Sequence, residues 1–288
     1  NDEFFGEHSN TDHLKIISNF TGSAGLAVIL KNINYLFVDG RYTLQANNQC
    51  GKEFKIITFP QKMPSDILKN KKISIGFDPA LFTNKTLNIF FGKNNYKFIP
   101  LSNNLIDQIW KRENKETKNK FYNLPNSSVG NTYKSKINKI ASYLKKKGAD
   151  FQFISASENN AWLLNIRGRD TNYTPIPHSY ILIDKYKNVK FFCDVKKISS
   201  SFKKNLSKIE FIKIELIGET LSKIENKKFI IDRNSCSIYF ENIILKNNNI
   251  LNLQDPVYFF KAIKNKREIK NIKLAHIYDG AALTKFLF

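Results

Sequence analysis

Residues 27–42 read AVILKNINYLFVDGRY, and this stretch decides the fold of the first part of the chain. Two apolar runs, 27–30 and 35–38, flank the turn residues 31–34, which read KNIN. Apolar runs on either side of a short polar segment are typical of a β-hairpin. The stretch therefore predicts two paired strands that end at Asp39-Gly40, with a short helix after them over residues 41–49.

The same order of elements returns at residues 180–194, which read YILIDKYKNVKFFCD. The hairpin-end residues Asp39 and Asp194 lie 155 positions apart, and the later strand-end residues Asp78 and Asp232 lie 154 apart. This common spacing indicates a degenerate internal repeat, although chance similarity of two α/β segments is the alternative. We predict an α/β fold with two tandem domains, each built on a mixed sheet flanked by helices.

The polar stretch 110–130 separates the two repeats, and it contains the charged run KRENK at 111–115. We place the first domain at residues 1–110 and the second at 111–254. The second domain opens with a helix, because apolar residues recur at helical spacing from Ile137 to Leu144, and a strand follows over 151–154. The first domain has no equivalent opening helix and strand, so we expect it to be truncated at its N-terminal end.

Residues 255–288 form a third element. Glu268 to Phe288 has its apolar residues mostly on one face, which predicts an amphipathic helix. The helix reaches Phe286-Leu287-Phe288 without the glycine, asparagine or proline that usually ends a helix. An apolar face that stops so abruptly implies a missing partner surface, so we interpret 255–288 as the start of a third domain.

The formal net charge is +21, from 46 basic and 25 acidic residues. Such a balance is compatible with a polyanion partner. However, few of the basic residues are arginine, the side chain best suited to phosphate and base recognition. The scattered lysines favour a solvated surface over a dedicated polyanion site, and we predict no specific nucleic-acid partner. No apolar run approaches the roughly 20 residues of a membrane-spanning helix, so we predict no membrane partner.

The cysteines and histidines do not form a recognisable site. They are Cys50, Cys193, Cys236, His8, His13, His178 and His276. Three distant cysteines fit neither a metal site nor a disulfide framework, so we interpret them as free thiols in a reducing compartment, the cytoplasm first. The histidines join no histidine–carboxylate cluster of metal-binding spacing. We therefore predict no catalytic residue and no metal ligand in this chain.

Several stretches carry a family resemblance. They are 20–25 (FTGSAG) with 39–42 (DGRY), 161–170 (AWLLNIRGRD), 261–268 (KAIKNKRE) and 275–283 (AHIYDGAAL). In this order they resemble segments of eukaryotic three-domain aminopeptidase P, the Xaa-Pro aminopeptidase family. The resemblance covers essentially the whole chain, and the combination of motifs is specific although each motif alone is weak.

The resemblance implies two creatinase/prolidase N-terminal-like domains followed by a catalytic pita-bread domain, of which 255–288 supplies only the first helix. In that family the catalytic domain binds two divalent metal ions, usually Mn²⁺, which polarise a carbonyl group and generate a hydroxide. The enzyme removes the N-terminal residue from peptides with proline in second position. This chain would then be the non-catalytic part of a metallopeptidase, inactive alone and without bound metal, that shapes access for short peptides and supports a homodimer.

Arg41 is the one residue to which the resemblance gives a role in substrate binding. A guanidinium always carries charge and can fork onto a carboxylate or a carbonyl group. From the residues alone, a local ion pair with Asp39 is the alternative. For Arg167, Arg169 and Asp170 we favour a structural use, such as positioning a loop, and Trp162 is interpreted as a core residue.

Two further classes of function stay open. Peptidase-like domains of this type also occur in a histone chaperone, so a non-catalytic interaction module is one alternative. Polyanion binding through the lysine surface is the other. The residues that follow Phe288 distinguish the first alternative from an enzyme, because an enzyme needs intact metal ligands there.

Overall fold

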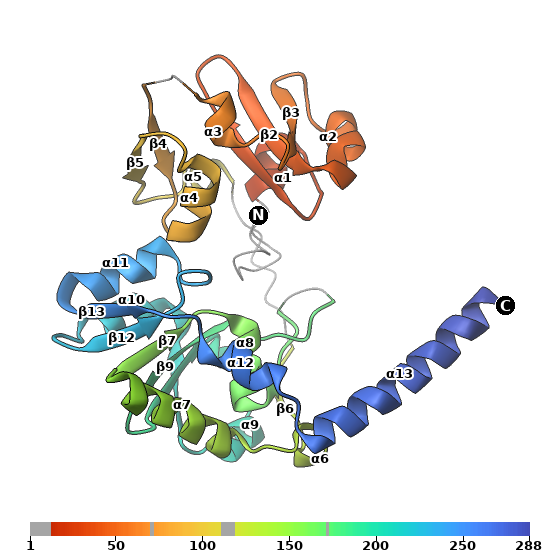
Figure 1. The fold of residues 1–288 in the computed structure, drawn as a ribbon, viewed down its shortest axis with the longest axis vertical. Helices are drawn as coiled ribbons and strands as arrows, with labels where there is room; N and C mark the ends of the chain where they lie inside the picture. The colour runs from red at the N-terminus through yellow and green to blue at the C-terminus, as the bar shows by residue number, and fades with distance from the viewer. Residues whose placement is uncertain (1–12, 70–71, 111–118, 171–172) are drawn as a thin grey trace. The chain divides into compact units, whose positions relative to one another are not determined.

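The computed structural model describes residues 13–69, 72–110, 119–170 and 173–288 (Figure 1). His8 and the charged run 111–115 lie outside these residues. The chain forms two compact units. Unit 1 comprises Asn1–Thr117 and Arg233–Asn242, and unit 2 comprises Lys118–Asp232 and Ile243–Phe288. The predicted α/β fold with two domains and mixed sheets is confirmed, whereas the boundaries at residues 110 and 254 stay predictions.

The first sheet of unit 1 contains the hairpin predicted from residues 27–42. Strand β1 (Gly25–Ile29) is antiparallel to β2 (Asn34–Asp39), and β2 is parallel to β3 (Phe54–Phe59). Helices α1 (His13–Ser18) and α2 (Thr43–Gln49) belong to this part of the unit. The core residues here are Leu14, Phe20, Leu36, Val38 and Ala46.

The second sheet of unit 1 pairs β4 (Ser74–Phe77) in parallel with β5 (Lys97–Pro100). Helix α4 (Asn84–Phe91) begins at a capping box formed by Thr83 and Thr86. The core here contains Leu68, Phe77, Leu87, Phe91 and Ile238, the last from the start of α11 (Ile238–Asn247). The short helices α3 (Pro64–Ile67) and α5 (Leu105–Ile109) complete the unit among the described residues.

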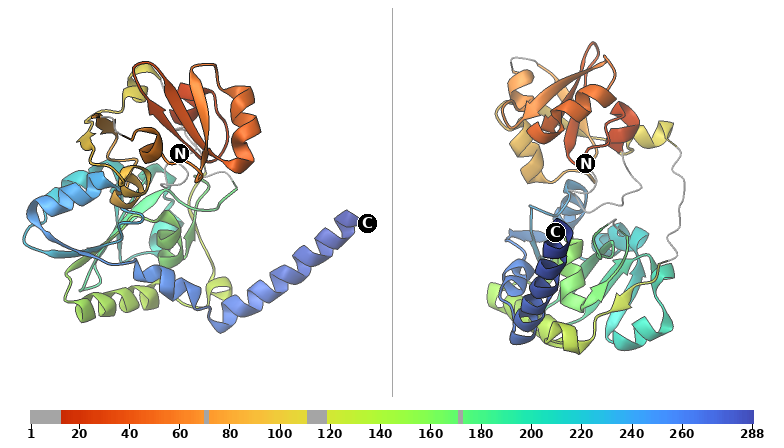
Figure 2. Two further views of the ribbon diagram at one scale, coloured as in Figure 1. Left: turned by 45° about the horizontal axis from the view of Figure 1, so that its top comes forward. Right: turned by 90° about the vertical axis from the view of Figure 1, so that its right-hand side faces the viewer.

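Unit 2 is built on one six-stranded sheet within the described residues, in the order β11-β10-β9-β7-β12-β13. Figure 2 shows the green and blue elements of this unit from two further sides. The antiparallel pairs are β9 with β10 and β7 with β9, and the other neighbours are parallel. The strands are β7 (Phe151–Ile154), β9 (Ser179–Asp184), β10 (Val189–Cys193), β11 (Ile209–Lys213), β12 (Lys228–Ile231) and β13 (Asn249–Asn252). The two-residue strands β6 (Tyr122–Asn123) and β8 (Ile166–Arg167) form a separate antiparallel pair.

Both faces of this sheet are covered. The main core takes strand residues such as Ile181 and Phe191 together with helical residues such as Ile140 and Leu163. Because side chains alternate along a strand, Leu182 and Phe192 point to the opposite face, where they are also buried. The helices of the unit are α6 (Asn126–Val129), α7 (Tyr133–Lys147), α8 (Ser157–Leu164), α9 (Ser200–Asn205), α10 (Ile217–Ser222), α12 (Pro256–Ala262) and α13 (Lys266–Leu287).

The internal repeat extends to single hydrogen bonds. Asp39 ends β2 and caps the 3-10 helix η2 (Gly40–Tyr42), and Asp194 follows β10 and caps η3 (Val195–Lys197) in the same way. Each aspartate accepts a hydrogen bond from the backbone N–H two residues later. The spacing of 155 residues therefore marks a common hairpin, turn and cap, followed in both units by a strand parallel to the second hairpin strand.

Helix α13 confirms the helix predicted at the C-terminal end of the chain. Asn265 and Glu268 form a capping box at its start. Nearby, Asn265 Nδ2 donates to Val129 O at 2.9 Å, and Asn271 Nδ2 donates to Ser128 O at 3.0 Å. None of the helical residues is buried, so the apolar side chains from Ile269 to Leu287 face solvent.

Candidate functional site

Arg41 lies in the 3-10 turn η2, directly after β2. Its Nε donates to Asp39 Oδ1 at 2.8 Å, and its Nη2 lies 3.4 Å from Asp39 Oδ2. The local ion pair considered in the sequence analysis is therefore present. The Arg41 side chain is nevertheless 78% exposed, so the pair leaves much of the guanidinium accessible to a ligand.

Asp39 and Arg41 hold each other in their charged forms. The hydrogen bonds from the Arg41 side chain and backbone N–H lower the pKa of Asp39, and the carboxylate raises the pKa of Arg41. The carboxylate also fixes one side of the guanidinium fork. Nη1 makes no hydrogen bond within the described part of the chain, so both of its N–H groups remain available to a ligand.

The glycine-rich stretch 20–25 lies beside this turn. Ser23 Oγ is 2.6 Å from the hydroxyl of Tyr42, and the Arg41 guanidinium lies 5.7 Å from the centre of the Tyr42 ring. A Cβ atom at Gly22 would lie 2.2 Å from the ring of Phe20, which is fully buried. The glycine thus lets the loop pass over Phe20, and two of the motifs quoted for the family form one surface around Arg41.

The motif at residues 161–170 has a structural role in unit 2. Asp170 Oδ1 pairs with Lys197 Nζ at 2.5 Å, and both side chains are buried. Asp170 Oδ2 accepts from the backbone N–H of His178 at 2.8 Å. The aspartate therefore ties the segment before β9 to the turn after β10, which confirms the predicted structural use. Arg167 instead donates to Ile166 O at 2.8 Å, and the structure does not bring it to Asp170.

Trp162 is half-buried and packs against the main core of unit 2. The ammonium group of Lys136 lies 3.9 Å from the centre of the Trp162 ring and donates to Trp162 O at 2.8 Å. Burial lowers the pKa of Lys136 to about 8. Sequence reasoning placed Trp162 in the core correctly but did not find its buried cation, because an isolated lysine in a lysine-rich helix carries no signal.

A buried polar cluster in unit 2 was also not predicted. Asp255 Oδ1 accepts from Gln152 Nε2 at 2.7 Å, and its Oδ2 accepts from Asn159 Nδ2 at 2.6 Å. Its backbone N–H donates to Asp232 Oδ2 at 2.9 Å. Burial raises the pKa of Asp255 to about 6, against the hydrogen bonds that stabilise the carboxylate. Asp255 is only 3% exposed, so this cluster joins β7, α8 and α12 rather than receiving a ligand.

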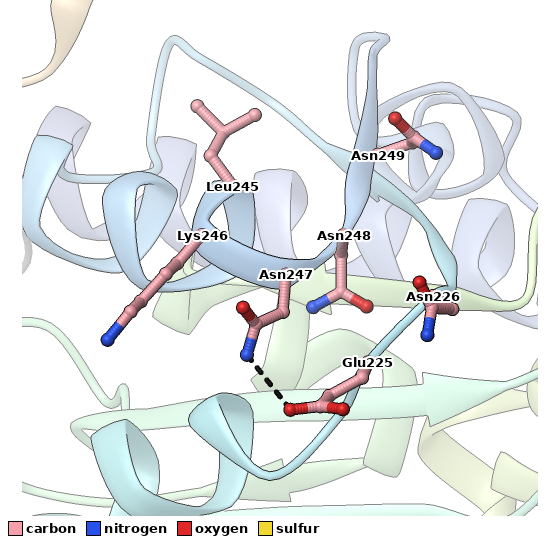
Figure 3. Close-up of a pocket in the computed structure, with 7 residues that line it drawn as sticks. All are labelled: Glu225, Asn226, Leu245, Lys246, Asn247, Asn248 and Asn249. Atoms are coloured by element: carbon pink, nitrogen blue, oxygen red, sulfur yellow. Dashed lines mark hydrogen bonds between the residues drawn. The ribbon is translucent and has the colours of Figure 1, made fainter.

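A shallow depression of about 450 Å³ lies in unit 2 between residues 225–226 and 245–249 (Figure 3). Asn247 Nδ2 donates to Glu225 Oε1 at 3.1 Å, and Asn248 Nδ2 donates to Ile224 O at 2.7 Å. These amides therefore hold loops together. The depression precedes β12 and β13, at the amino ends of two parallel strands, whereas open α/β sheets bind ligands at the carboxyl ends. We assign it a structural role.

Metal ligands do not converge in the part of the chain that the structure describes, since no group of three or more His, Cys, Asp or Glu side chains there could hold an ion. His13 Nε2 is 2.8 Å from Asp107 Oδ1, but this pair joins α1 to α5. No helix among the described residues is both long and apolar enough to cross a membrane.

Comparison with known proteins assigns both halves of the chain to a family. Two family models, each described as a creatinase/prolidase N-terminal domain, match residues 9–109 and 112–268. The chain belongs to the creatinase/prolidase N-terminal domain family. This creatinase/prolidase pair is 31% identical, over 94% of the chain, to a probable Xaa-Pro aminopeptidase P from Laccaria bicolor and to Xaa-Pro aminopeptidase 1 from Dictyostelium discoideum.

The predicted resemblance to aminopeptidase P is thereby confirmed. The alignments cover 44% and 46% of those two relatives, so the chain spans about half the length of the curated relatives it matches. Among solved structures, X-prolyl aminopeptidase from Caenorhabditis elegans, described as a cytosolic enzyme with a di-nuclear active site, matches with a TM-score of 0.86. That match covers 96% of this chain and 48% of the neighbour at 24% identity, and it supports the fold of two creatinase/prolidase domains.

Proposed function

We propose that this chain is the non-catalytic N-terminal part of a metal-dependent Xaa-Pro aminopeptidase, which removes the N-terminal residue from peptides with proline in second position. The similarity over 94% of the chain to proteins of that name carries the proposal. The two domains shape substrate access and support a cytoplasmic homodimer, and residues 255–288 begin the catalytic domain. The chain alone has no peptidase activity.

The metal centre of the proposed parent lies outside the described residues. The donor set found here does not fit a two-metal site, because no three ligand-type side chains converge within the described ranges, and such a site needs several carboxylate and imidazole ligands. The di-nuclear active site of the Caenorhabditis elegans neighbour supports two divalent ions in the parent. We propose Mn²⁺ as their identity, bound by residues other than those of this segment.

Arg41 is the proposed contribution of this chain to substrate binding. Its side chain is 78% exposed while Asp39 fixes its Nε. The guanidinium group is therefore held in one orientation but stays accessible to solvent. A guanidinium held on one side by a carboxylate can donate from its other side to a carbonyl or carboxylate of a peptide. The role is positional, since an arginine does not release a proton under ordinary conditions.

The repeat supplies a matched control for this proposal. Lys196 follows Asp194 by two residues, as Arg41 follows Asp39. In the full-length protein with Mn²⁺, we expect Arg41→Ala to lower kcat/KM for an Xaa-Pro peptide by about 10- to 100-fold, the equivalent of one or two charge-assisted hydrogen bonds. Lys196→Ala should leave kcat/KM unchanged. Equal activity of both variants and the unchanged protein would remove Arg41 from the proposal.

A second measurement tests the function itself. The chain of residues 1–288, assayed with Mn²⁺ on the same peptide, should give no proline-specific hydrolysis, while the full-length protein should hydrolyse it. Turnover by residues 1–288 would contradict the non-catalytic assignment, and an inactive full-length protein would favour the interaction-module alternative.

A further inference from the structure

The sheet of unit 2 gathers lysines at one end of its strands. Five of the strands, β7, β10, β11, β12 and β13, run in the same direction, and β9 runs in the opposite one. An exposed lysine lies within the four residues before each of these five strands, and β12 also begins with one. The lysine rim is defined by these six residues: Lys147, Lys187, Lys208, Lys227, Lys228 and Lys246.

The strand registers bring the lysine rim together. Phe151, the first residue of β7, lies opposite Phe229 and Asp184, so the starts of β7 and β12 lie beside the turn between β9 and β10. Strand β13 starts opposite Lys228, and β11 starts opposite Val189 of β10. Because neighbouring strands are about 4.8 Å apart, the six strands spread the rim over roughly 24 Å. Lysines that are scattered in the sequence thus form one surface.

The carboxylates at the same end of the sheet are occupied by bonds that hold the loops. Asp150 accepts from Lys185 Nζ at 2.8 Å and from the backbone N–H of Lys228 at 3.0 Å. Asp184 accepts from two backbone N–H groups of its own turn, and Glu225 accepts from an amide of α11 (Figure 3). By contrast, no lysine of the rim forms a salt bridge within the described ranges of the chain. The rim therefore carries positive charge that its own unit does not neutralise.

Helix ends account for only part of the lysine rim. Lys147 and Lys246 lie in the last turns of α7 and α11, where a cation opposes the helix dipole. The other four residues of the rim lie in turns or at the starts of strands. Lys187 adopts φ 78°, a conformation that glycine reaches with less strain. Because like charges held close together also repel one another, neither local structure nor stability explains the choice of lysine at these positions.

The opposite end of the same strands carries carboxylates. The residues that follow the five strands within four positions include Glu158, Asp194, Glu215, Asp232 and Asp255. Unit 2 is therefore electrically polar, with lysines before the strands and acidic residues after them. An anionic partner that approaches this unit is attracted to the lysine rim and repelled by the other end of the sheet.

The side chains of the lysine rim favour a nucleic-acid strand as that partner. A lysine ammonium group is a point charge that contacts phosphates without the bidentate geometry by which arginine reads bases. Tyr186 lies between Lys185 and Lys187 in the turn and is 70% exposed. An exposed aromatic ring among cations allows an unpaired base to stack while the phosphates meet the lysines. An acidic peptide or an anionic membrane supplies the charge but no base.

We propose that the lysine rim and Tyr186 bind single-stranded RNA through its phosphates, without preference for sequence. RNA is the single-stranded nucleic acid of the cytoplasm, the compartment proposed above. Contacts to the phosphate backbone carry no sequence information, so the prediction of no specific nucleic-acid partner is kept, while the polyanion alternative acquires a location. The inference is independent of the proposed peptidase function.

Fluorescence anisotropy of a labelled oligouridylate of about 12 nucleotides tests the proposal on the full-length protein. Because each lysine contact releases counterions, the logarithm of the binding constant should fall against the logarithm of the KCl concentration with a slope of about −4. Replacing Lys187, Lys227 and Lys228 together by glutamine should reduce the slope to about −2 and the affinity by at least about tenfold. Absence of binding at about 50 mM KCl would overturn the proposal.

Three lysines at the other end of unit 2 supply a matched control. Lys134, Lys213 and Lys264 are exposed and form no salt bridge within the described residues. Lys134 lies about 20 Å along α7 from Lys147, which is beyond the Debye length in physiological salt. Their joint replacement by glutamine removes the same net charge and should change the affinity by less than about twofold. Equal losses in the two triple variants would show that net charge, and not the lysine rim, holds the RNA.

Tyr186 variants and competitors separate RNA from other polyanions. Tyr186→Ala should weaken binding by about tenfold without changing the salt slope, because stacking releases no counterion, and Tyr186→Phe should bind like the unchanged protein. Unlabelled oligoglutamate of the same charge should compete at least about tenfold less well than unlabelled RNA. Full affinity in Tyr186→Ala together with equal competition by oligoglutamate would assign the rim to an acidic polypeptide. Binding to phosphatidylserine vesicles without binding to RNA would assign it to a membrane surface, and either result overturns the proposal.

Discussion

Units 1 and 2 use the same hairpin, yet their strands are buried to different degrees. In β9, four of six residues are buried, whereas no residue of β1 is. In β12, three of four residues are buried, against one of four in β4. The hairpin sequences are similarly apolar, so the difference arises from their neighbours: β7 pairs with β9 and β12, and residues of α7 and α8 such as Ile140 and Leu163 pack in the same core. Burial of a strand is thus decided by its neighbours as much as by its own residues.

The charged residues of the two turns differ in the same direction. Lys197 and Asp170 form an ion pair whose side chains are 7% and 2% exposed, whereas Arg41 and Asp39 are 78% and 38% exposed. A buried pair loses its solvation on folding, so each charge depends on its partner. An exposed pair can exchange its partner for water or for a ligand at little cost. The turn of unit 1 is therefore the one whose cation stays accessible to solvent.

The largest predicted effect separates these two pairs. Lys197→Met leaves Asp170 buried without its cation and should lower the free energy of unfolding of unit 2 by about 3–5 kcal/mol. Arg41→Met should leave the stability unchanged because its partner remains hydrated. Both variants can be compared by urea unfolding, followed by the fluorescence of Trp162 in a Trp110→Phe background and by hydrogen exchange in unit 1. Similar midpoints for the Lys197 variant and the parent would show that the pair contributes no net stability.

The second effect concerns pH and the position that follows the last strand of each unit. Asp255 donates its backbone N–H to Asp232, and in unit 1 Asn104 donates to Asp78 from its side chain at 2.9 Å. Both residues cap the helix that follows. Only Asp255 titrates. Its pKa of about 6 lies above the ordinary 3.8, chiefly because of burial and against the bonds from Val257, Asn159 and Gln152.

A raised pKa means that the folded state binds this proton more tightly than the unfolded state does. The contribution of Asp255 is therefore complete below about pH 4 and is lost as pH rises from about 4 through 6, by roughly 2–3 kcal/mol. Asp255→Asn should remove this slope. Urea midpoints measured from pH 4 to 7, with Glu210→Gln as an exposed control, test the prediction. An unchanged slope in Asp255→Asn would show that Asp255 is not the group that causes it.

The sequence predicts the local parts of this fold better than the contacts between them. The runs around Asp39 and Asp194 lie within one hairpin each, so apolar runs and turn residues were sufficient to place them. Asp255 instead meets Gln152 and Asn159 across 103 and 96 residues of sequence. No periodic pattern encodes such a distance. Helix α11 was also not predicted, and its residues are divided between units 1 and 2.

The candidate site likewise depends on contacts that the sequence does not reveal. The Asp39-Gly40-Arg41-Tyr42 stretch suggested either a local pair or a substrate contact, and the structure contains the pair with most of the guanidinium still exposed. The local pair is thereby confirmed, and the substrate contact stays a prediction. Sequence could not decide between them, because exposure depends on which neighbours cover the turn, and in unit 2 the equivalent turn lies beside the buried pair of Lys197 and Asp170.

The smallest effect compares two asparagines at equivalent helix ends. Asn165 and Asn19 both adopt the left-handed conformation, which glycine reaches with less strain. Their side chains differ. Asn165 Oδ1 accepts from Lys136 Nζ at 2.5 Å, and its Nδ2 donates to Asn131 O at 2.8 Å. Asn19 is exposed, and its side chain makes no hydrogen bond within the described residues.

The two glycine variants should consequently change the stability of their units in different directions. Asn165→Gly relieves the backbone but removes an acceptor from a buried ammonium group, so it should destabilise unit 2 by about 1–3 kcal/mol. Asn19→Gly only relieves the backbone and should change the stability of unit 1 by less than about 0.5 kcal/mol, if anything upward. Urea unfolding with hydrogen exchange in each unit measures both. Equal effects would mean that backbone conformation alone sets the residue at this position, and that Lys136 finds another acceptor when Asn165 is removed.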